Sequence, residues 1–277
     1  MKMSKLLTFM FMVSLFITGG LFLFGVQTAN ALIWQGTADY TQGPGATGDE
    51  DVVGPFDTYD FGPGAILLGG LGGPLSVGNT FDNYYQSYVD GHSLSGPGAV
   101  SPSLNITGAG SGYELTVASN FQTEITSVGF STSFILTGGT IDLYFDTTPD
   151  YSFTGDSGFT NGGAVISGTV VGGAGTTIYG MLGVTSIDFQ VNSFNSNVFE
   201  PDTIDTGSSV YTLQLWTPAD FKFISSVTSV QGHTKGAHDV LMVADGNMSF
   251  TAVPEPTSLL LIGTGILGLV ALRRQRP

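Results

Sequence analysis

Short runs in which apolar and polar residues alternate dominate the chain between residues 111 and 253. The clearest alternation is in residues 113–118 and, in part, 141–146. A period of two puts successive side chains on opposite faces of a β-strand. Similar runs, rich in Val, Ile, Thr, Tyr and Phe and bounded by Gly, Asn, Asp or Pro, cover residues 165–171, 176–182, 187–194, 210–216 and 248–253. This pattern predicts many short strands joined by turns.

The region before residue 111 has a weaker pattern. Residues 32–40 begin with Leu-Ile-Trp and are compatible with a first strand. Residues 41–73 are interrupted so often by Gly and Pro that we expect turns and loops there. In residues 80–89, four aromatic residues fall at spacings of three and four, which favours a short helix over a strand.

Many short strands, no long segment of period 3.6 and frequent turn signals predict an all-β fold, either a single β-sandwich or a jelly-roll-like domain. No fixed-period repeat is visible, which argues against a solenoid or a propeller. We expect this one domain to cover residues 32–252, between an N-terminal signal peptide and a C-terminal transmembrane sorting helix.

The C-terminal segment, residues 253–277, has three parts. Pro254 and Pro256 flank Glu255 and cannot continue a strand or a helix, so the folded part should end here. The uncharged apolar run 257–272 follows, and as a helix it would span roughly 24 Å at about 1.5 Å per residue. Bilayer thinning or flanking residues can close the small gap to a hydrocarbon core of about 30 Å.

A cluster of arginines ends the chain, at Arg273, Arg274 and Arg276. Cationic flanks stay on the cytoplasmic side of a membrane helix. Everything before Val253 is therefore expected to lie outside the cytoplasm.

The order of these three parts resembles the PEP-CTERM sorting signal of Gram-negative bacteria. The resemblance implies processing near the motif by an exosortase, a transpeptidase-like membrane enzyme, after a transient stage in the inner membrane. The body would then be released towards the cell surface. The alternative is a tail anchor that is never cut. The expected sorting and processing residues are Val253, Pro254, Glu255, Pro256, Arg273, Arg274 and Arg276.

Residues 1–31 predict a signal peptide, with a short basic region, an apolar region at 6–26 and a small-x-small cleavage site at Ala29 and Ala31. The Sec translocon and signal peptidase are the partners that this segment implies. Because the apolar region exceeds the usual length of about 7–15 residues, an uncleaved anchor is the alternative.

The charge of the body is strongly negative. Between residues 32 and 272 only Lys222 and Lys235 are basic, against all 22 acidic residues, so this span carries a net charge of −20. Such a surface repels phosphate backbones and excludes nucleic acid as a partner. The chain has no cysteine, which rules out disulfides, thiolate metal sites and cysteine nucleophiles.

Residues 112–117, 141–146 and 163–170 are similar to segments of PEP-CTERM proteins associated with flocculation. This second resemblance implies binding of cells to one another or to exopolysaccharide. It supplies no catalytic residues.

Calcium is the ion that the sequence could accommodate best, because hard cations take oxygen ligands from flexible loops. The candidate ligands are Asp142, Asp146, Asp150 and Asp156, leading to Asn161, with residues 49–51 as a second acidic cluster. Neither cluster fits the EF-hand pattern. Solvated, unpaired carboxylates explain the same residues, and no cofactor is otherwise expected.

Three other features were weighed for chemistry. Asp205-Thr206-Gly207 resembles the loop of aspartic proteases, but the required second copy is missing, so a polar turn is favoured. His233 and His238 lie five residues apart, a spacing that favours a surface loop over a metal pair. Tyr84, Tyr85 and Tyr88 could stack on sugar rings, although aromatic runs are more often core.

We therefore expect a non-enzymatic, exported surface or matrix protein that acts in aggregation, flocculation or biofilm formation with exopolysaccharide. One alternative is an exported enzyme, either a β-sandwich carbohydrate-active enzyme, since paired carboxylates can come from distant positions, or the less favoured aspartic protease. A third possibility is a purely structural coat protein with no specific ligand.

Overall fold

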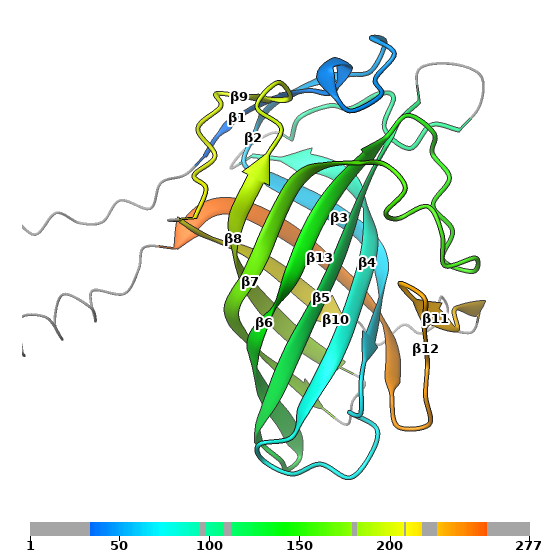
Figure 1. Cartoon of the computed structure of the whole chain (residues 1–277), viewed down its shortest axis with the longest axis vertical. Coiled ribbons are helices and arrows are strands. Elements are labelled where there is room, and N and C mark those ends of the chain that lie inside the picture. Colours follow the sequence, from blue (N-terminus) through cyan, green and yellow to red (C-terminus); the bar gives the residue numbers. More distant parts are fainter. Residues whose placement is uncertain are drawn as a thin grey trace, which may run out of the picture. The chain divides into compact units, whose positions relative to one another are not determined.

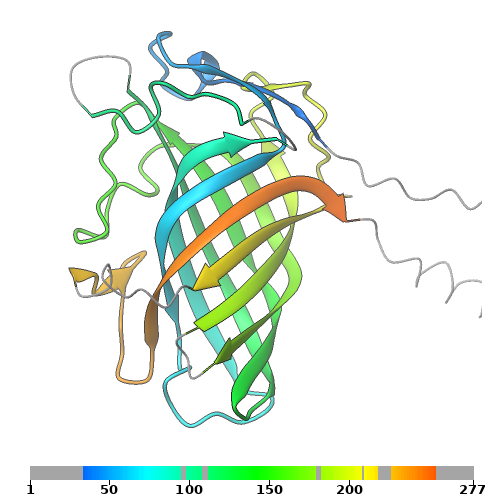
Figure 2. The ribbon, with the colours of Figure 1, turned by 180° about the vertical axis from the view of Figure 1, so that it is seen from behind.

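The computed structural model describes residues 34–94, 98–107, 112–178, 182–207, 209–217 and 226–253. Its largest element is a closed antiparallel barrel of eight strands, in the order β10-β13-β3-β4-β5-β6-β7-β8 (Figure 1). The barrel closes because its last strand in the chain, β13, pairs with its first, β3, as well as with β10. This pairing is best seen from behind (Figure 2). The barrel strands are β3 (Thr58–Leu68), β4 (Thr80–Ser93), β5 (Glu114–Ser127), β6 (Ser131–Asp146), β7 (Gly163–Ile178), β8 (Leu182–Phe194), β10 (Val210–Thr217) and β13 (Val240–Val253).

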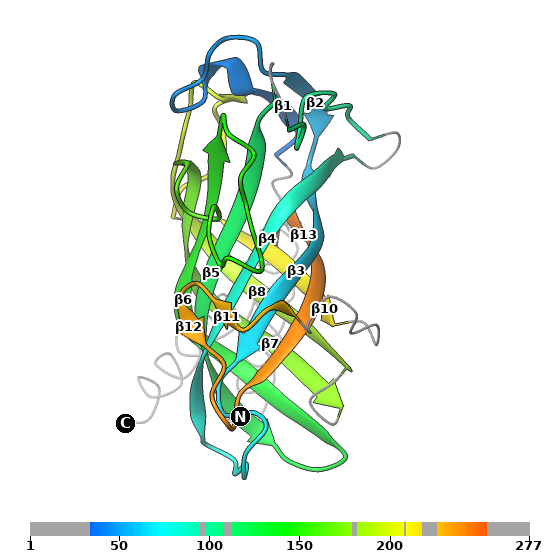
Figure 3. The same ribbon diagram turned by 90° about the vertical axis from the view of Figure 1, so that its right-hand side faces the viewer.

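Smaller elements accompany the barrel. A three-stranded sheet, in the order β2-β1-β9, lies at one end of it (Figure 1). A short hairpin, β11 with β12, lies against the outside of the barrel beside β3 and β4 (Figure 3). Their bounds are β1 (Gly36–Asp39), the 3₁₀ helix η1 (Tyr40–Gln42), β2 (Val52–Phe56), β9 (Phe199–Glu200), β11 (Ser229–Val230) and β12 (His233–Thr234).

The barrel interior is filled with apolar side chains. Along β5, Leu115, Val117 and Phe121 are buried within the main core, whereas Asn120 and Gln122 on the opposite face are exposed. Period-two alternation therefore separates the core from the surface, as the sequence pattern predicts. The inside of the barrel is a packed core and not a channel.

The prediction of an all-β fold is confirmed, but the sandwich or jelly roll is not. The sheet does not split into two layers, because its strands of up to 16 residues curl until the two edges meet. Glycines at irregularities in the pairing assist this curvature: Gly139 (φ 144°) and Gly173 (φ 128°) adopt backbone angles that other residues rarely take. Such irregularities increase local bending and twist.

The interpretation of residues 80–89 as a helix was wrong, because they form part of strand β4. Tyr85 points into the core, while Tyr84 and Tyr88 lie on the outer face. The outer face is also apolar here because a second cluster, which includes Val227 and Val230, packs against Tyr84. Burial on both faces hides the alternation that would mark a strand.

Two other segments also differ from the prediction. Residues 41–73 contain β2 and the barrel strand β3, although Gly and Pro suggested loops. The separate runs 165–171 and 176–182 belong to β7 and the start of β8, since glycines 172, 173 and 175 continue β7 through its irregularity.

The expected signal peptide, with Ala29 and Ala31, and the expected sorting helix at 257–272 lie outside the described residues. In the part of the chain that the structure describes, no helix is long and apolar enough to cross a membrane.

A buried polar network joins the end sheet to the barrel. His92 of β4 contacts the Tyr40 hydroxyl through Nε2 (2.7 Å) and the Ser101 hydroxyl through Nδ1 (2.9 Å). The Tyr40 hydroxyl also contacts that of Tyr59 (3.0 Å). Burial among these groups and the Phe56 ring lowers the pKa of His92 to about 3.

This network predicts a contribution of His92 to stability that is lost in acid. His92 stays neutral in the folded state but titrates near 6.5 when unfolded, so its contribution is complete above pH 6.5 and lost as pH falls towards 3. Between pH 7 and pH 5 the free energy of unfolding of the wild type should fall by roughly 2 kcal/mol more than that of His92→Gln. His92→Gln should flatten that slope in urea titrations at each pH, and an unchanged slope would contradict the assignment.

Candidate functional site

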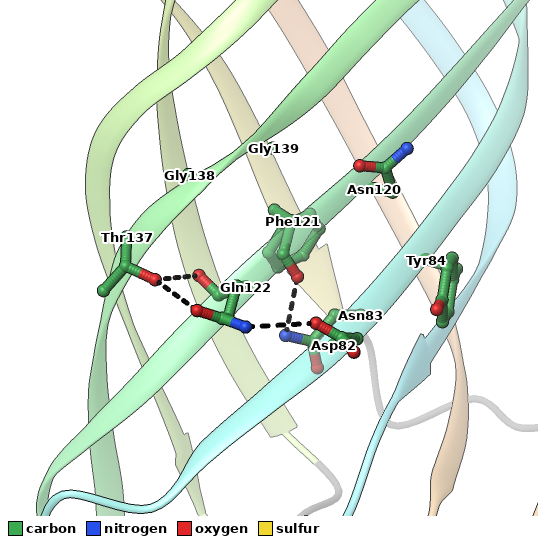
Figure 4. Close-up of a pocket in the computed structure, with 9 residues that line it drawn as sticks. All are labelled: Asp82, Asn83, Tyr84, Asn120, Phe121, Gln122, Thr137, Gly138 and Gly139. Atoms are coloured by element: carbon green, nitrogen blue, oxygen red, sulfur yellow. Dashed lines mark hydrogen bonds between the residues drawn. The ribbon is translucent and has the colours of Figure 1, made fainter.

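A shallow groove of about 450 Å³ runs over the outer face of the barrel, across three neighbouring strands (Figure 4). Its lining mixes polar and apolar surface, and it carries one carboxylate. The residues that line it are Asp82, Asn83 and Tyr84 from β4, Asn120, Phe121 and Gln122 from β5, and Thr137, Gly138 and Gly139 from β6.

The strand register sets these side chains in rows. Asp82 lies opposite Gln122, which in turn lies opposite Gly138. The Gln122 amide donates to Asp82 (3.4 Å), and the Thr137 hydroxyl donates to the Gln122 side-chain oxygen (3.3 Å). The rim therefore offers amide, hydroxyl and carboxylate groups held by one another, which suits a polar uncharged ligand.

Two glycines make the floor of the groove. A Cβ added at Gly138 would meet nothing within 4 Å, so this side of the strand is open. A Cβ added at Gly139 would lie 2.1 Å from the Asn120 carbonyl oxygen, so β5 and β6 approach each other closely here. The groove exists because no side chain occupies the Gly138 position.

The three tyrosines weighed as a sugar platform do not lie together. Tyr85 is buried in the core, Tyr84 stacks on His233 (ring centroids 3.7 Å apart), and Tyr88 stacks on Tyr151 (4.6 Å). Only Tyr84 lines the groove. Partial burial, and secondarily the charge of Asp82, raise the pKa of Tyr84, so its hydroxyl remains a donor.

A second polar feature lies on the same outer face, where β5 begins and β6 ends. One carboxylate oxygen from each of Glu114, Asp146 and Asp150 lies within 4.8 Å of the others. Glu114 and Asp146 are cross-strand partners on β5 and β6, and Asp150 follows in the loop 147–162. Glu114 is fully buried, and its Oε2 accepts from the backbone NH groups of Asp150 (2.9 Å) and Tyr151 (3.2 Å).

The electrostatics of this carboxylate cluster follow from burial. Desolvation is the main cause that raises the pKa of Glu114 to about 7, and the charges of Asp150 and Asp146 act in the same direction. The backbone NH donors oppose the shift. Three acidic groups are thus held together against their mutual repulsion.

The four aspartates proposed from sequence as calcium ligands divide into three groups. Asp146 and Asp150 come together, as their shared cluster shows. Asp142 lies on β6 opposite Ala118 and Ser167, outside the cluster. Asp156 instead accepts from Gly232 NH (2.7 Å), Gln231 NH (2.9 Å) and the Gln86 amide (2.9 Å), and so holds the β11–β12 hairpin.

Sequence reasoning missed Glu114. The signal was present, because an acidic residue at the start of the alternating run 113–118 implied a carboxylate near one end of a strand. Its partner Asp146 is 32 positions away, and only the strand register brings the two together.

The other acidic candidates accept hydrogen bonds within the protein. Glu50 accepts from the backbone NH groups of Thr47 (2.8 Å) and Gly48 (2.9 Å). Asp51 accepts from Ser103 NH (2.7 Å). Asp205 accepts from the Ser209 hydroxyl (2.5 Å) in the segment that leads into β10, a position that agrees with a polar turn.

The two histidines considered as a metal pair make separate contacts. His233 stacks on Tyr84, whereas the backbone carbonyl of His238 accepts from Gly72 NH (2.8 Å).

Comparison with known proteins identifies the C-terminal segment. A family model for the PEP-CTERM protein-sorting motif matches residues 252–275. The chain thus carries a PEP-CTERM sorting motif, which implies export, a transient membrane-anchored C-terminus and processing by an exosortase. The match includes Val253, the last residue of β13, and the other sorting residues lie outside the described part. No curated protein and no solved structure matches the chain.

The floor of the groove yields a stability prediction. Gly139→Ala forces a Cβ against the Asn120 carbonyl at an unfavourable φ and should lower the free energy of unfolding by roughly 2 kcal/mol or more. Gly138→Ala, one residue away, should change it by less than about 0.5 kcal/mol. Urea unfolding of the two purified variants checks this, and equal effects would show that the Gly139 position tolerates a Cβ.

Proposed function

We propose that this chain is a non-enzymatic exported protein of the cell surface or extracellular matrix. It acts in cell aggregation, flocculation or biofilm formation by binding neutral exopolysaccharide in the groove over β4, β5 and β6. The single observation that carries this proposal is that the exposed amides and hydroxyl of Asn120, Gln122 and Thr137 lie around a glycine floor beside the ring of Tyr84.

The chemistry of the lining favours sugars. Sugar hydroxyls both donate and accept, and Asn120, Gln122 and Thr137 offer matching groups on an exposed face. The ring of Tyr84 adds an amphipathic edge next to Asp82. The strong negative charge of the body disfavours anionic polymers, so a neutral polysaccharide is the class that fits.

The same lining disfavours a carbohydrate-active enzyme. Glycoside hydrolysis ordinarily uses two carboxyl groups that flank the bond. Among the described residues that line the groove, Asp82 is the one carboxylate. Glu114 has carboxylate neighbours but no exposed surface through which a sugar could reach it. The aspartic protease alternative gains nothing from Asp205, whose carboxylate is bonded to Ser209.

The delivery route predicts a specific mature product. Export and exosortase processing should give a body that starts at Leu32, ends near Val253 and lies outside the cell. Replacement of both Pro254 and Pro256 by Ala should leave the chain in the inner membrane. Intact mass and cell fractionation measure both outcomes, and a wild-type chain that keeps Arg273 to Arg276 in the membrane would show a simple anchor.

Binding at the groove has a matched control. Asn120→Ala removes an exposed amide in the groove that donates to Thr140 (3.0 Å), whereas Asn192→Ala removes an equivalent amide outside it that donates to Thr169 (2.8 Å). Asn120→Ala should weaken binding of the neutral polysaccharide extracted from the producing cells roughly tenfold, and Asn192→Ala should not.

Gly138→Leu fills the floor and should abolish that binding while leaving the fold intact. Calorimetric titration reads out all three variants. A wild type with no saturable signal would instead describe a coat protein without a specific ligand, and equal losses in both Asn variants would place binding elsewhere.

A further inference from the structure

We propose that Glu114, Asp146 and Asp150 bind one calcium ion, which fastens the loop 147–162 to the outer face of the barrel. The inference is independent of the groove and of polysaccharide binding. Each ligand comes from a different element: Glu114 from β5, Asp146 from the end of β6, and Asp150 from the loop itself.

The spacing of the oxygen atoms fits a calcium ion. Calcium binds oxygen at about 2.4 Å, so two ligands on opposite sides of the ion are at most about 4.8 Å apart. One oxygen from each of the three carboxylates lies within 4.8 Å of the others. Only small side-chain movements are therefore needed for all three to contact one ion.

A buried oxygen without a partner gives independent evidence for a ligand. Glu114 Oε2 accepts two backbone NH groups, but Oε1 is buried and has no hydrogen-bond partner. A buried carboxylate oxygen in that state is costly, and native proteins almost always satisfy it. A cation between Glu114 and its two acidic neighbours would supply the missing partner.

No basic side chain neutralises the cluster within the described residues. Their one lysine, Lys235, lies beside Asp239 and helps to lower the pKa of that carboxyl. Asp150 is exposed and Asp146 half-buried, so an ion from solvent can reach the cluster. Three carboxylates without a basic partner attract a divalent cation strongly.

The irregular source of the ligands, two strands and a loop, favours calcium over magnesium. Magnesium requires near-ideal octahedral geometry at about 2.1 Å and retains several waters. Calcium accepts six to eight oxygens in irregular arrangements, as loops supply them. Here Asn161 already donates to both oxygens of Asp150 (3.1 and 3.2 Å), and Gly158 lets the loop backbone approach Asp150 closely.

The loop 147–162 contacts both the barrel and the β11–β12 hairpin, so fixing it would stabilise both contacts. It covers the barrel beside β4 and β5, where Phe159 carbonyl accepts from the Thr116 hydroxyl (2.8 Å) and Tyr151 stacks on Tyr88 (Figure 3). Its Asp156 holds the β11–β12 hairpin through Gly232. An ion at Asp150 would therefore stabilise the whole cover on this side of the barrel.

Terbium luminescence and thermal unfolding test the site on the purified full chain. Tb³⁺ replaces calcium and is sensitised by a nearby tyrosine, here Tyr151. The signal should saturate at one ion per chain and be displaced by Ca²⁺. At a calcium concentration 100-fold above the dissociation constant, the melting temperature should rise by roughly 5–10 °C relative to EDTA.

Glu114→Gln keeps the side-chain shape and an oxygen that accepts from the backbone NH groups, but it should abolish both terbium binding and the calcium-dependent rise in melting temperature. Asp150→Asn tests the site from the loop and serves if Glu114→Gln folds poorly. Asp142→Asn, an aspartate on β6 outside the cluster, should leave both effects intact. Binding that does not saturate, or that falls equally in Asp142→Asn, would mean diffuse attraction to an acidic surface and overturn the proposal. An unchanged melting temperature in calcium and EDTA would show that Glu114 is neutralised by a proton instead.

Discussion

The pairing of β13 with both β10 and β3 is the constraint on which the rest of this structure depends. An open eight-stranded sheet would expose two edges and one apolar face to water, and both would promote association with other chains. Closure removes the edges and turns one face of every strand inward. The interior then holds the aromatic and aliphatic core, with Phe145, Phe189 and Phe250 fully buried. A chain without cysteine gains a continuous hydrogen-bonded wall in place of disulfides.

Closure also decides what the outer face can do. Because most apolar residues are directed inward, the outside of β5 to β8 carries many amides, hydroxyls and small residues, with Ile135, Val171 and Val184 exposed among them. The groove lies on this face. The outside of β3 and β4 is different, since the loop 147–162 and the β11–β12 hairpin cover it with a second apolar cluster. Tyr84 lies at the boundary, lining the groove and stacking on His233 of the hairpin. The loop 147–162 carries Asp150 of the carboxylate cluster, and the hairpin that this loop holds contacts Tyr84 at the groove.

The acidic residues of the chain hold local structure as well as giving the surface its negative charge. Glu50, Asp156 and Asp239 accept backbone NH groups, and these donors hold the pKa of each carboxyl low. Glu114 differs because burial outweighs its two NH donors. This contrast separates acidic residues that shape loops from a buried carboxylate whose charge the described residues leave uncompensated.

The sequence by itself determined the local and the linear features of this protein. Period-two alternation depends only on neighbouring residues, so the strands β5, β7, β8 and β10 could be predicted, and with them the all-β class. The sorting motif is likewise a linear signal, and Pro254-Glu255-Pro256 with its arginine cluster could be recognised without any fold. Tertiary structure alone decided that the sheet closes, because closure depends on register and curvature summed over eight strands. It also decided that β4 is a strand, since burial on both faces conceals its period. Finally, it brought Glu114 to Asp146 and Asp150, because strand pairing joins residues that lie far apart in the chain and carry no shared pattern.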